Sequence, residues 1–164
     1  MINVKCIHYD GGRGVFSVQE ARDRAWDERI RASARQHYGD QRQVNARGYF
    51  SLLNVIYTIS EIIEFSSRLS QKGIYTDSIR IEISIHNASG FELMPGEDRS
   101  WWNHFLLQSD NVGKEWEFDT TDLISSSAEQ SFKICLWFFE RFGWLDPPIE
   151  YLRSDQQKFL EGHA

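Results

Sequence analysis

Acidic side chains are the most abundant groups in this chain that can do acid–base or metal chemistry. Glu82 lies four residues before His86 in one alternating segment, and Glu115, Glu117 and Asp119 alternate along another. Carboxylates and imidazoles transfer protons and bind divalent metals, so two neighbouring strands carrying them would form a metal-dependent hydrolytic site. Acids on sheet faces are also ordinary solvated groups. A hydrolase or nuclease is therefore kept as an alternative, with no residue assigned as catalytic or as a metal ligand.

Large aromatic side chains give the best indication of an interaction surface. Trp101 and Trp102 are adjacent, so in a regular strand they point to opposite faces, and at least one is then exposed or covered by a partner. Together with Trp116 and Phe105 they also have the character of a stacking platform for single-stranded nucleic acid. Such platforms normally lie in a basic groove, whereas the neighbouring residues here are mainly acidic. We therefore expect Trp101 and Trp102 to contact a protein partner or a second copy of the chain.

Arginines are concentrated in the first third of the sequence. The stretch 20–47 holds seven arginines against five acids, and the stretch 92–122 holds eight carboxylates. Good helix formers predict a helix over residues 20–36, and we expect Arg22 and Arg29 on it to contribute to an interaction surface. Nucleic-acid binding through this helix is a second alternative, with an affinity that would fall steeply with salt. The formal net charge of −6 argues against general attraction to nucleic acid or an anionic membrane.

Other reactive motifs are missing from the sequence. The glycines at 11, 12 and 14 lack the Lys-Ser or Lys-Thr pair of a phosphate-binding loop and instead indicate a hairpin turn. The histidines show no zinc-binding spacing, and no GxSxG motif marks a nucleophilic serine. Cys6 and Cys135 are far apart, and Cys135 lies in an apolar run typical of a buried thiol. We expect no cofactor, no metal and a protein that is not an enzyme.

Length and composition indicate one domain. The 164 residues include eleven Phe, six Tyr and six Trp, which is ample for a packed core. No run of eighteen apolar residues occurs, and the first twenty positions lack the apolar centre of a signal peptide, so we expect a cytoplasmic protein without membrane contact. We divide this single domain into an N-terminal strand and helix arm, 1–48, and a core, 49–164.

The elements that must position these side chains are clearest between residues 49 and 86. Apolar residues at steps of three and four predict a helix that ends at Gln71 or Lys72, where Gly73 permits a left-handed turn. This stripe comprises Leu52, Val55, Ile56, Ile59, Ile62, Ile63 and Leu69. Four isoleucines then alternate with polar residues from Ser78 onward, which predicts a strand with one buried face. We expect 87–90 to turn and Phe91–Leu93 to return beside this strand as a hairpin.

The remaining elements follow from turn and capping signals. One or two short strands are expected within 1–18, and two more at 101–108 and 114–118, separated by a turn. Ser126 followed by Glu129 has the form of a capping box for a strongly apolar helix that ends near Phe142. Asp146 before two prolines predicts the N-cap of a last helix. Together these elements indicate an α+β fold, a mostly antiparallel sheet with two to three helices packed on one face.

Four segments together resemble the C-terminal region of bacterial proteins that carry a Schlafen AlbA-like DNA-binding domain. They are residues 55–69, residues 72–75, the strand 81–86 with Gly90 beyond it, and residues 139–144 with Pro147 and Pro148. The resemblance spans 49–160 and concerns packing and turn patterns, so it carries over no site residues. It implies a regulatory or phage-defence system linked to nucleic acid. Because the AlbA-like domain itself is missing, we expect a fragment or a stand-alone module that acts through a partner.

Overall fold

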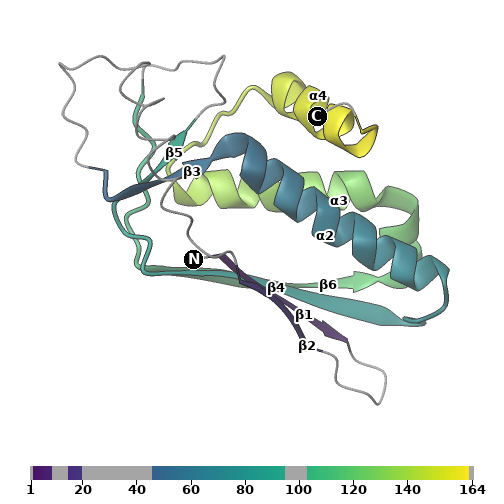
Figure 1. Ribbon diagram of the computed structural model, residues 1–164. Helices are drawn as coiled ribbons and strands as arrows, with labels where there is room; N and C mark the ends of the chain where they lie inside the picture. The colour runs from purple at the N-terminus through teal and green to yellow at the C-terminus, as the bar shows by residue number, and fades with distance from the viewer. Residues whose placement is uncertain (1, 9–14, 20–45, 95–102, 163–164) are drawn as a thin grey trace.

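The protein has an α+β fold in which two helices cover one face of a four-stranded sheet, as the computed structural model shows (Figure 1). The structure describes residues 2–8, 15–19, 46–94 and 103–162. Within them the elements are β1 (Ile2–His8), β2 (Val15–Gln19), β3 (Gly48–Ser51), α2 (Leu52–Gln71), β4 (Ser78–His86), β5 (Phe91–Met94), β6 (Asn111–Asp119), α3 (Thr120–Arg141) and α4 (Ile149–Leu160). The helix expected over 20–36 lies outside the described residues.

The main sheet has the strand order β2-β1-β4-β6, and every neighbouring pair in it is antiparallel. All four isoleucines of β4 are almost completely buried beneath the helices. This confirms the strand and the buried face that the alternating pattern predicts. Strands β1 and β2 pair with each other, which confirms the expectation of one or two short strands near the N-terminus.

The expected hairpin between β4 and the following strand is wrong. Strand β5 forms, but it pairs in parallel with β3 in a separate two-stranded sheet. The physical reason is that both edges of β4 are already occupied, by β1 on one side and β6 on the other. The turn between them includes Asn87 and Gly90, both with positive φ, and it carries the chain away from the main sheet.

The strand expected at 101–108 is also wrong over its described part. Residues 103–108 are irregular apart from one bridge between Leu106 and Glu92. Here the backbone of Phe105 and Leu107 hydrogen-bonds to β5, with Leu107 N–H donating to the Phe91 carbonyl at 2.8 Å. The next strand, β6, is longer than predicted because it begins at Asn111, inside the stretch expected to turn.

Helix α2 ends at Gln71, where the sequence indicates. The Ser51 hydroxyl accepts a hydrogen bond from the Asn54 N–H at 3.4 Å and caps the first turn. At the other end Gly73 adopts φ +71, and Ile74 N–H donates to the Leu69 carbonyl. Most of the apolar stripe is buried, and Ile62 and Leu69 are partly buried against the same core.

The last two helices are capped differently from the prediction. Asp119, at the end of β6, accepts from the Thr121 N–H at 2.8 Å, so α3 begins six residues before the expected capping box and is kinked at Ser126. The Glu129 carboxylate binds Arg153 of α4 at 2.7 Å. The proposed cap of α4 at Asp146 is wrong, because the helix begins after Pro148. A residue that precedes a proline disfavours helical backbone, so the first proline stays outside the helix.

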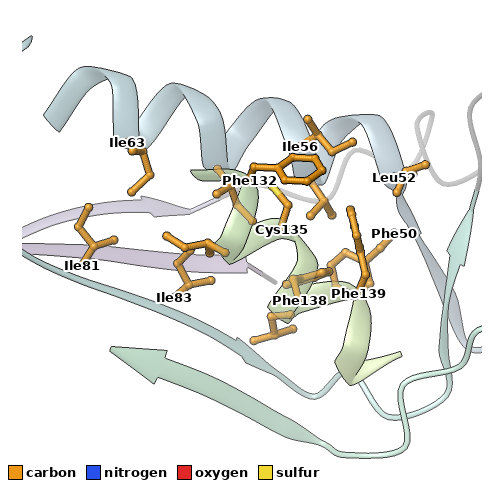
Figure 2. Close-up of a cluster of buried hydrophobic side chains, with 14 of the residues drawn as sticks. Phe50, Leu52, Ile56, Ile63, Ile81, Ile83, Phe132, Cys135, Phe138 and Phe139 are labelled. Atoms are coloured by element: carbon orange, nitrogen blue, oxygen red, sulfur yellow. The ribbon is translucent and has the colours of Figure 1, made fainter. Parts of the chain in front are cut away.

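The core lies between the isoleucine face of the sheet and the paired helices α2 and α3 (Figure 2). Its largest fully buried side chains include Phe132, Phe138 and Phe139 of α3, so the apolar run of this helix supplies much of the core. Phe50 of β3 packs edge-on against Phe138 at 6.0 Å between ring centroids. This contact joins the small parallel sheet to the main core.

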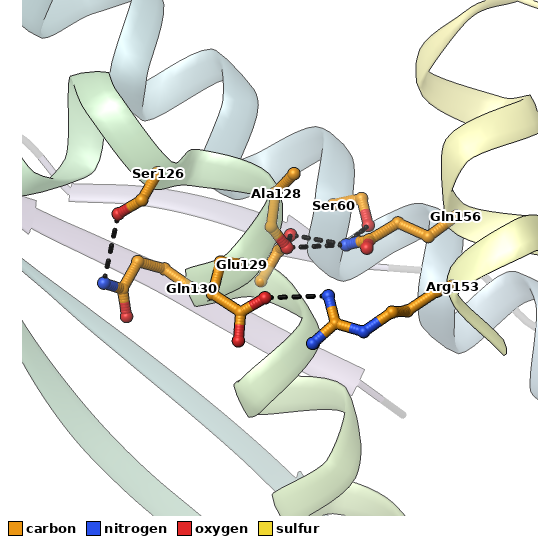
Figure 3. A network of polar contacts seen from close by, with 8 residues as sticks. Ser60, Ser126, Ala128, Glu129, Gln130, Arg153 and Gln156 are labelled. Atoms are coloured by element: carbon orange, nitrogen blue, oxygen red, sulfur yellow. Dashed lines mark hydrogen bonds and ion pairs between the residues drawn. The ribbon is translucent and has the colours of Figure 1, made fainter. Parts of the chain in front are cut away.

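Helix α4 packs on α2 and α3 through a polar network (Figure 3). The buried Gln156 side chain donates from Nε2 to the Ser131 hydroxyl at 2.7 Å, the Ala128 carbonyl at 3.0 Å and the Ser60 hydroxyl at 3.1 Å. Arg153 completes the contact through its ion pair with Glu129. One amide therefore fixes the positions of three helices relative to one another.

Candidate functional site

The acids that the sequence offers for chemistry lie on the face of the main sheet opposite the helices. Glu82 of β4 is paired directly with Glu115 of β6, and Arg80 is paired with Glu117. Residues directly opposite each other in an antiparallel pair share a face, so these four side chains form one group. We call this group, Arg80, Glu82, Glu115 and Glu117, the open-face cluster.

Arg80 is the centre of the open-face cluster. Its Nε atom lies 3.2 Å from Glu115 Oε1, and its Nη2 atom lies 3.4 Å from Glu117 Oε2. The Ser78 hydroxyl also donates to Glu117, at 3.2 Å. These groups are substantially exposed, so each ion pair contributes at most about 1 kcal/mol to folding. The pairing nevertheless matches both β6 acids to a cation, and no local sequence pattern distinguishes Arg80 from the other polar residues of β4.

The other members of the predicted hydrolytic cluster are separated from these acids. His86 lies four residues along the strand from Glu82, about 13 Å at the usual rise per residue, and its Nδ1 atom is 3.0 Å from Asn111 Oδ1. Asp119 caps α3. Among the described residues, no group of three or more His, Cys, Asp or Glu side chains is placed to hold a metal ion. Of the residues predicted for a hydrolytic site, the structure places Glu82, Glu115 and Glu117 beside one another and places His86 and Asp119 apart from them.

The aromatic residues expected to form a stacking platform are divided. Trp101, Trp102, Arg22 and Arg29 lie outside the described residues. Phe105 stacks on another aromatic ring, that of Trp144, at 5.2 Å between centroids. The interaction role expected for Trp101, Trp102, Arg22 and Arg29 therefore stays a prediction.

Trp116 of β6 lies edge-on to Trp137 of α3, with 5.0 Å between ring centroids, and both are partly buried. Lys114 Nζ lies 5.3 Å from the Trp116 ring, and the Arg141 guanidinium lies 5.3 Å from the Trp137 ring. Cations at these positions attract the ring faces. The residues next to Trp116 in the sequence are mainly acidic, whereas Trp137 and Arg141 belong to a helix twenty or more residues further along the chain. The sequence alone therefore did not indicate these aromatic and cationic neighbours.

Strand β6 is the terminal strand of the main sheet. It pairs with β4 on one side, and on its other side it pairs with no strand of the described chain. Most of its side chains are exposed or partly exposed, and Phe118 is its buried residue. Such an edge presents backbone N–H and C=O groups to which another extended segment can hydrogen-bond.

A buried acid that the sequence did not suggest lies in β5. The side chain of Glu92 is 0% exposed, and its Oε1 atom lies 2.6 Å from His104 Nδ1. Its Oε2 atom has no hydrogen-bond partner within the described residues. Burial raises the pKa of Glu92 above its ordinary value of 4.5, and the hydrogen bond and charge of His104 oppose this rise. An acid between Phe91 and Leu93 in a short apolar strand is the sequence signal that would have identified it.

The buried thiol has no comparable partner. Cys135 is completely buried in α3, and burial raises the pKa of its thiol far above the ordinary value. Thiolates are the reactive form of cysteine, so this residue is an apolar packing group, as the sequence predicts.

The part of the chain that the structure describes also contains no helix with the length and apolarity needed to cross a bilayer.

The chain was compared with protein-family models, with curated proteins and with solved structures, and none of the three comparisons gave a match.

Proposed function

We propose that this protein is a non-enzymatic interaction module, and that it works in a bacterial regulatory or defence system linked to nucleic acid. The second half of this proposal rests on the family resemblance of residues 49–160. The first half rests on the arrangement of the main sheet. The observation that carries it is the terminal position of β6, a strand of nine residues whose outer edge no described strand covers.

The open-face cluster supports binding more than catalysis. Catalytic acids typically combine a perturbed pKa with a cleft and a charge partner. Here Glu115 and Glu117 are exposed and each is matched to Arg80, which is the arrangement of a solvated sheet face. A partner strand placed beside β6 would meet these side chains at the rim of its binding surface.

A pair of experiments tests this function. Sedimentation velocity and affinity capture with the tagged protein should reveal either self-association or a specific protein partner, and a strict monomer that captures nothing would count against the proposal. Hydrolysis of DNA, RNA and nucleotides with Mg²⁺, Mn²⁺ or Zn²⁺ should be the same for wild type and for Glu82→Gln. A metal-dependent activity that disappears in Glu82→Gln would establish the alternative, a hydrolase or nuclease that uses strand carboxylates.

The pair formed by Glu92 and His104 favours a second candidate function, acid–base catalysis. A carboxylate that accepts from one imidazole nitrogen fixes the tautomer of the ring, and this is how acid–base histidines are oriented in many enzymes. The contact of 2.6 Å and the complete burial of Glu92 fit that role. An activity that depends on His104 and survives in Glu82→Gln would identify this candidate.

Nucleic-acid binding through Arg22, Arg29 and the helix expected around them stays a prediction. A gel shift at low salt that fades steeply with added salt would support it. The absence of any shift at low salt would exclude it.

A further inference from the structure

We infer that the outer edge of β6 binds an extended polypeptide segment in which basic and apolar residues alternate. This inference rests on the proposed function and goes beyond it by naming the surface and the chemistry of the partner. It combines the outer backbone edge of β6, which no strand of the described residues covers, with the two different faces that this strand presents.

The open face of β6 selects basic residues. Glu115 and Glu117 both point to this face, and Glu82 lies opposite Glu115 on the neighbouring strand. Arg80 lies within 3.4 Å of both β6 acids, and the register pairs Glu82 with Lys5 of β1 on its other side, so two cations accompany three carboxylates on this face. A strand added beside β6 would place every second side chain next to these acids. Lysine or arginine at those positions would compensate the remaining negative charge.

The helix-facing side of β6 selects apolar residues. Val112 and Trp116 are paired with Ile85 and Ile81 of β4, so they share the buried face of the sheet. Both are only partly buried, because β6 is the terminal strand. The other alternate side chains of an added strand would cover this apolar border. Lys114 lies on the same side and would repel a basic residue there.

Charge disfavours the simplest alternative, in-register pairing of two β6 strands. In an antiparallel pair with both helix layers on one side, Glu115 and Glu117 of one copy would lie opposite or diagonal to the same acids of the other. Like charges at such positions destabilise strand pairing. A basic segment, in contrast, gains both backbone hydrogen bonds and charge compensation, which is the general mode of strand addition to a sheet edge.

The test uses the whole protein and a synthetic peptide of nine residues in which lysine and valine alternate. Binding is measured by fluorescence anisotropy of the labelled peptide, and the site is located by amide chemical-shift changes in NMR spectra. We expect saturable binding that weakens with salt, with shifts concentrated at 111–119. Glu115→Gln and Glu117→Gln should each weaken binding by up to about fivefold, the range expected for exposed charge pairs.

Two controls separate strand addition from general attraction to an acidic protein. Glu61→Gln removes an exposed carboxylate on α2 and should leave peptide affinity unchanged. A peptide of the same composition, with its lysines and valines in separate blocks, should bind at least tenfold more weakly, because it can satisfy only one face at a time. Circular dichroism melting confirms that each variant is folded.

The outcomes distinguish this inference from the function on which it rests. Equal binding of both peptides, equal losses in Glu61→Gln and Glu115→Gln, or shifts outside β6 would overturn the inference. Absence of peptide binding would also overturn it, while capture of a partner through another surface would leave the interaction function standing. A catalytic activity lost in Glu82→Gln would overturn the function whatever the peptide does.

Discussion

Replacement of Gln156 by leucine tests whether one buried amide holds the three helices together. The Gln156 side chain is 4% exposed, and its two N–H groups serve acceptors on α2 and α3 at 2.7 to 3.1 Å. Leucine is similar in size but donates no hydrogen bond. Gln156→Leu therefore leaves the Ser60 and Ser131 hydroxyls without a buried donor and changes the packing volume little.

The expected loss follows from the number of bonds. An amide nitrogen has two hydrogens, so the three contacts correspond to about two hydrogen bonds, each contributing about 1 kcal/mol net. We expect Gln156→Leu to lower the free energy of unfolding by about 2 kcal/mol, and the Tm by about 4 to 8 °C for a chain of this length. Urea denaturation followed by far-UV circular dichroism measures the first quantity, and calorimetry measures the second.

A control and a rescue make this prediction specific. Gln157 lies on the exposed side of the same helix and donates to Glu161 at 2.8 Å, so Gln157→Leu should change stability by less than about 0.5 kcal/mol. Adding Ser60→Ala and Ser131→Ala to Gln156→Leu should recover part of the loss, because the orphaned hydroxyls are then gone. If Gln156→Leu costs no more than Gln157→Leu, the amide does not join the helices and the reasoning is refuted.

Two further predictions concern the buried acid and the end of α3. The pKa of Glu92 is raised above 4.5 in the folded protein, so ionisation of this carboxyl disfavours folding. The stability of wild type relative to Glu92→Gln should therefore fall as pH rises through the folded pKa. Denaturant titrations at several pH values measure this stability difference, and an increase of it with pH would contradict the prediction. Gly143 has φ +82, and a Cβ added there would meet open space. Gly143→Ala should therefore lower the free energy of unfolding by about 1 kcal/mol through backbone strain alone. An unchanged unfolding midpoint would show that the turn relaxes.

Elements whose patterns are local could be read directly from the sequence. The stripe of α2, the isoleucines of β4 and the left-handed turn at Gly73 depend on residues within a few positions of one another. Helical and strand periodicities are decided by burial of one face, and each of these segments carries that pattern over its whole length.

Features that depend on long-range pairing could not be read in this way. Strand β5 pairs with β3, more than forty residues earlier, because β4 had already gained two neighbours. The same pairing buries Glu92, which a simple alternation would have placed in water. In the candidate site, the sequence supplied Glu82, Glu115 and Glu117, whereas the role of Arg80 came from the register between β4 and β6.

The sequence by itself determined the helix of α2, the strand of β4 and which face of each is apolar. The tertiary structure decided which strands are neighbours, and therefore that β6 stands at an edge, that its acids meet Arg80 and that Trp116 meets Trp137 of α3. The physical reason is that secondary-structure periodicity is a local property of side-chain spacing. Strand order and register are instead set by competition among all segments for the same buried surface.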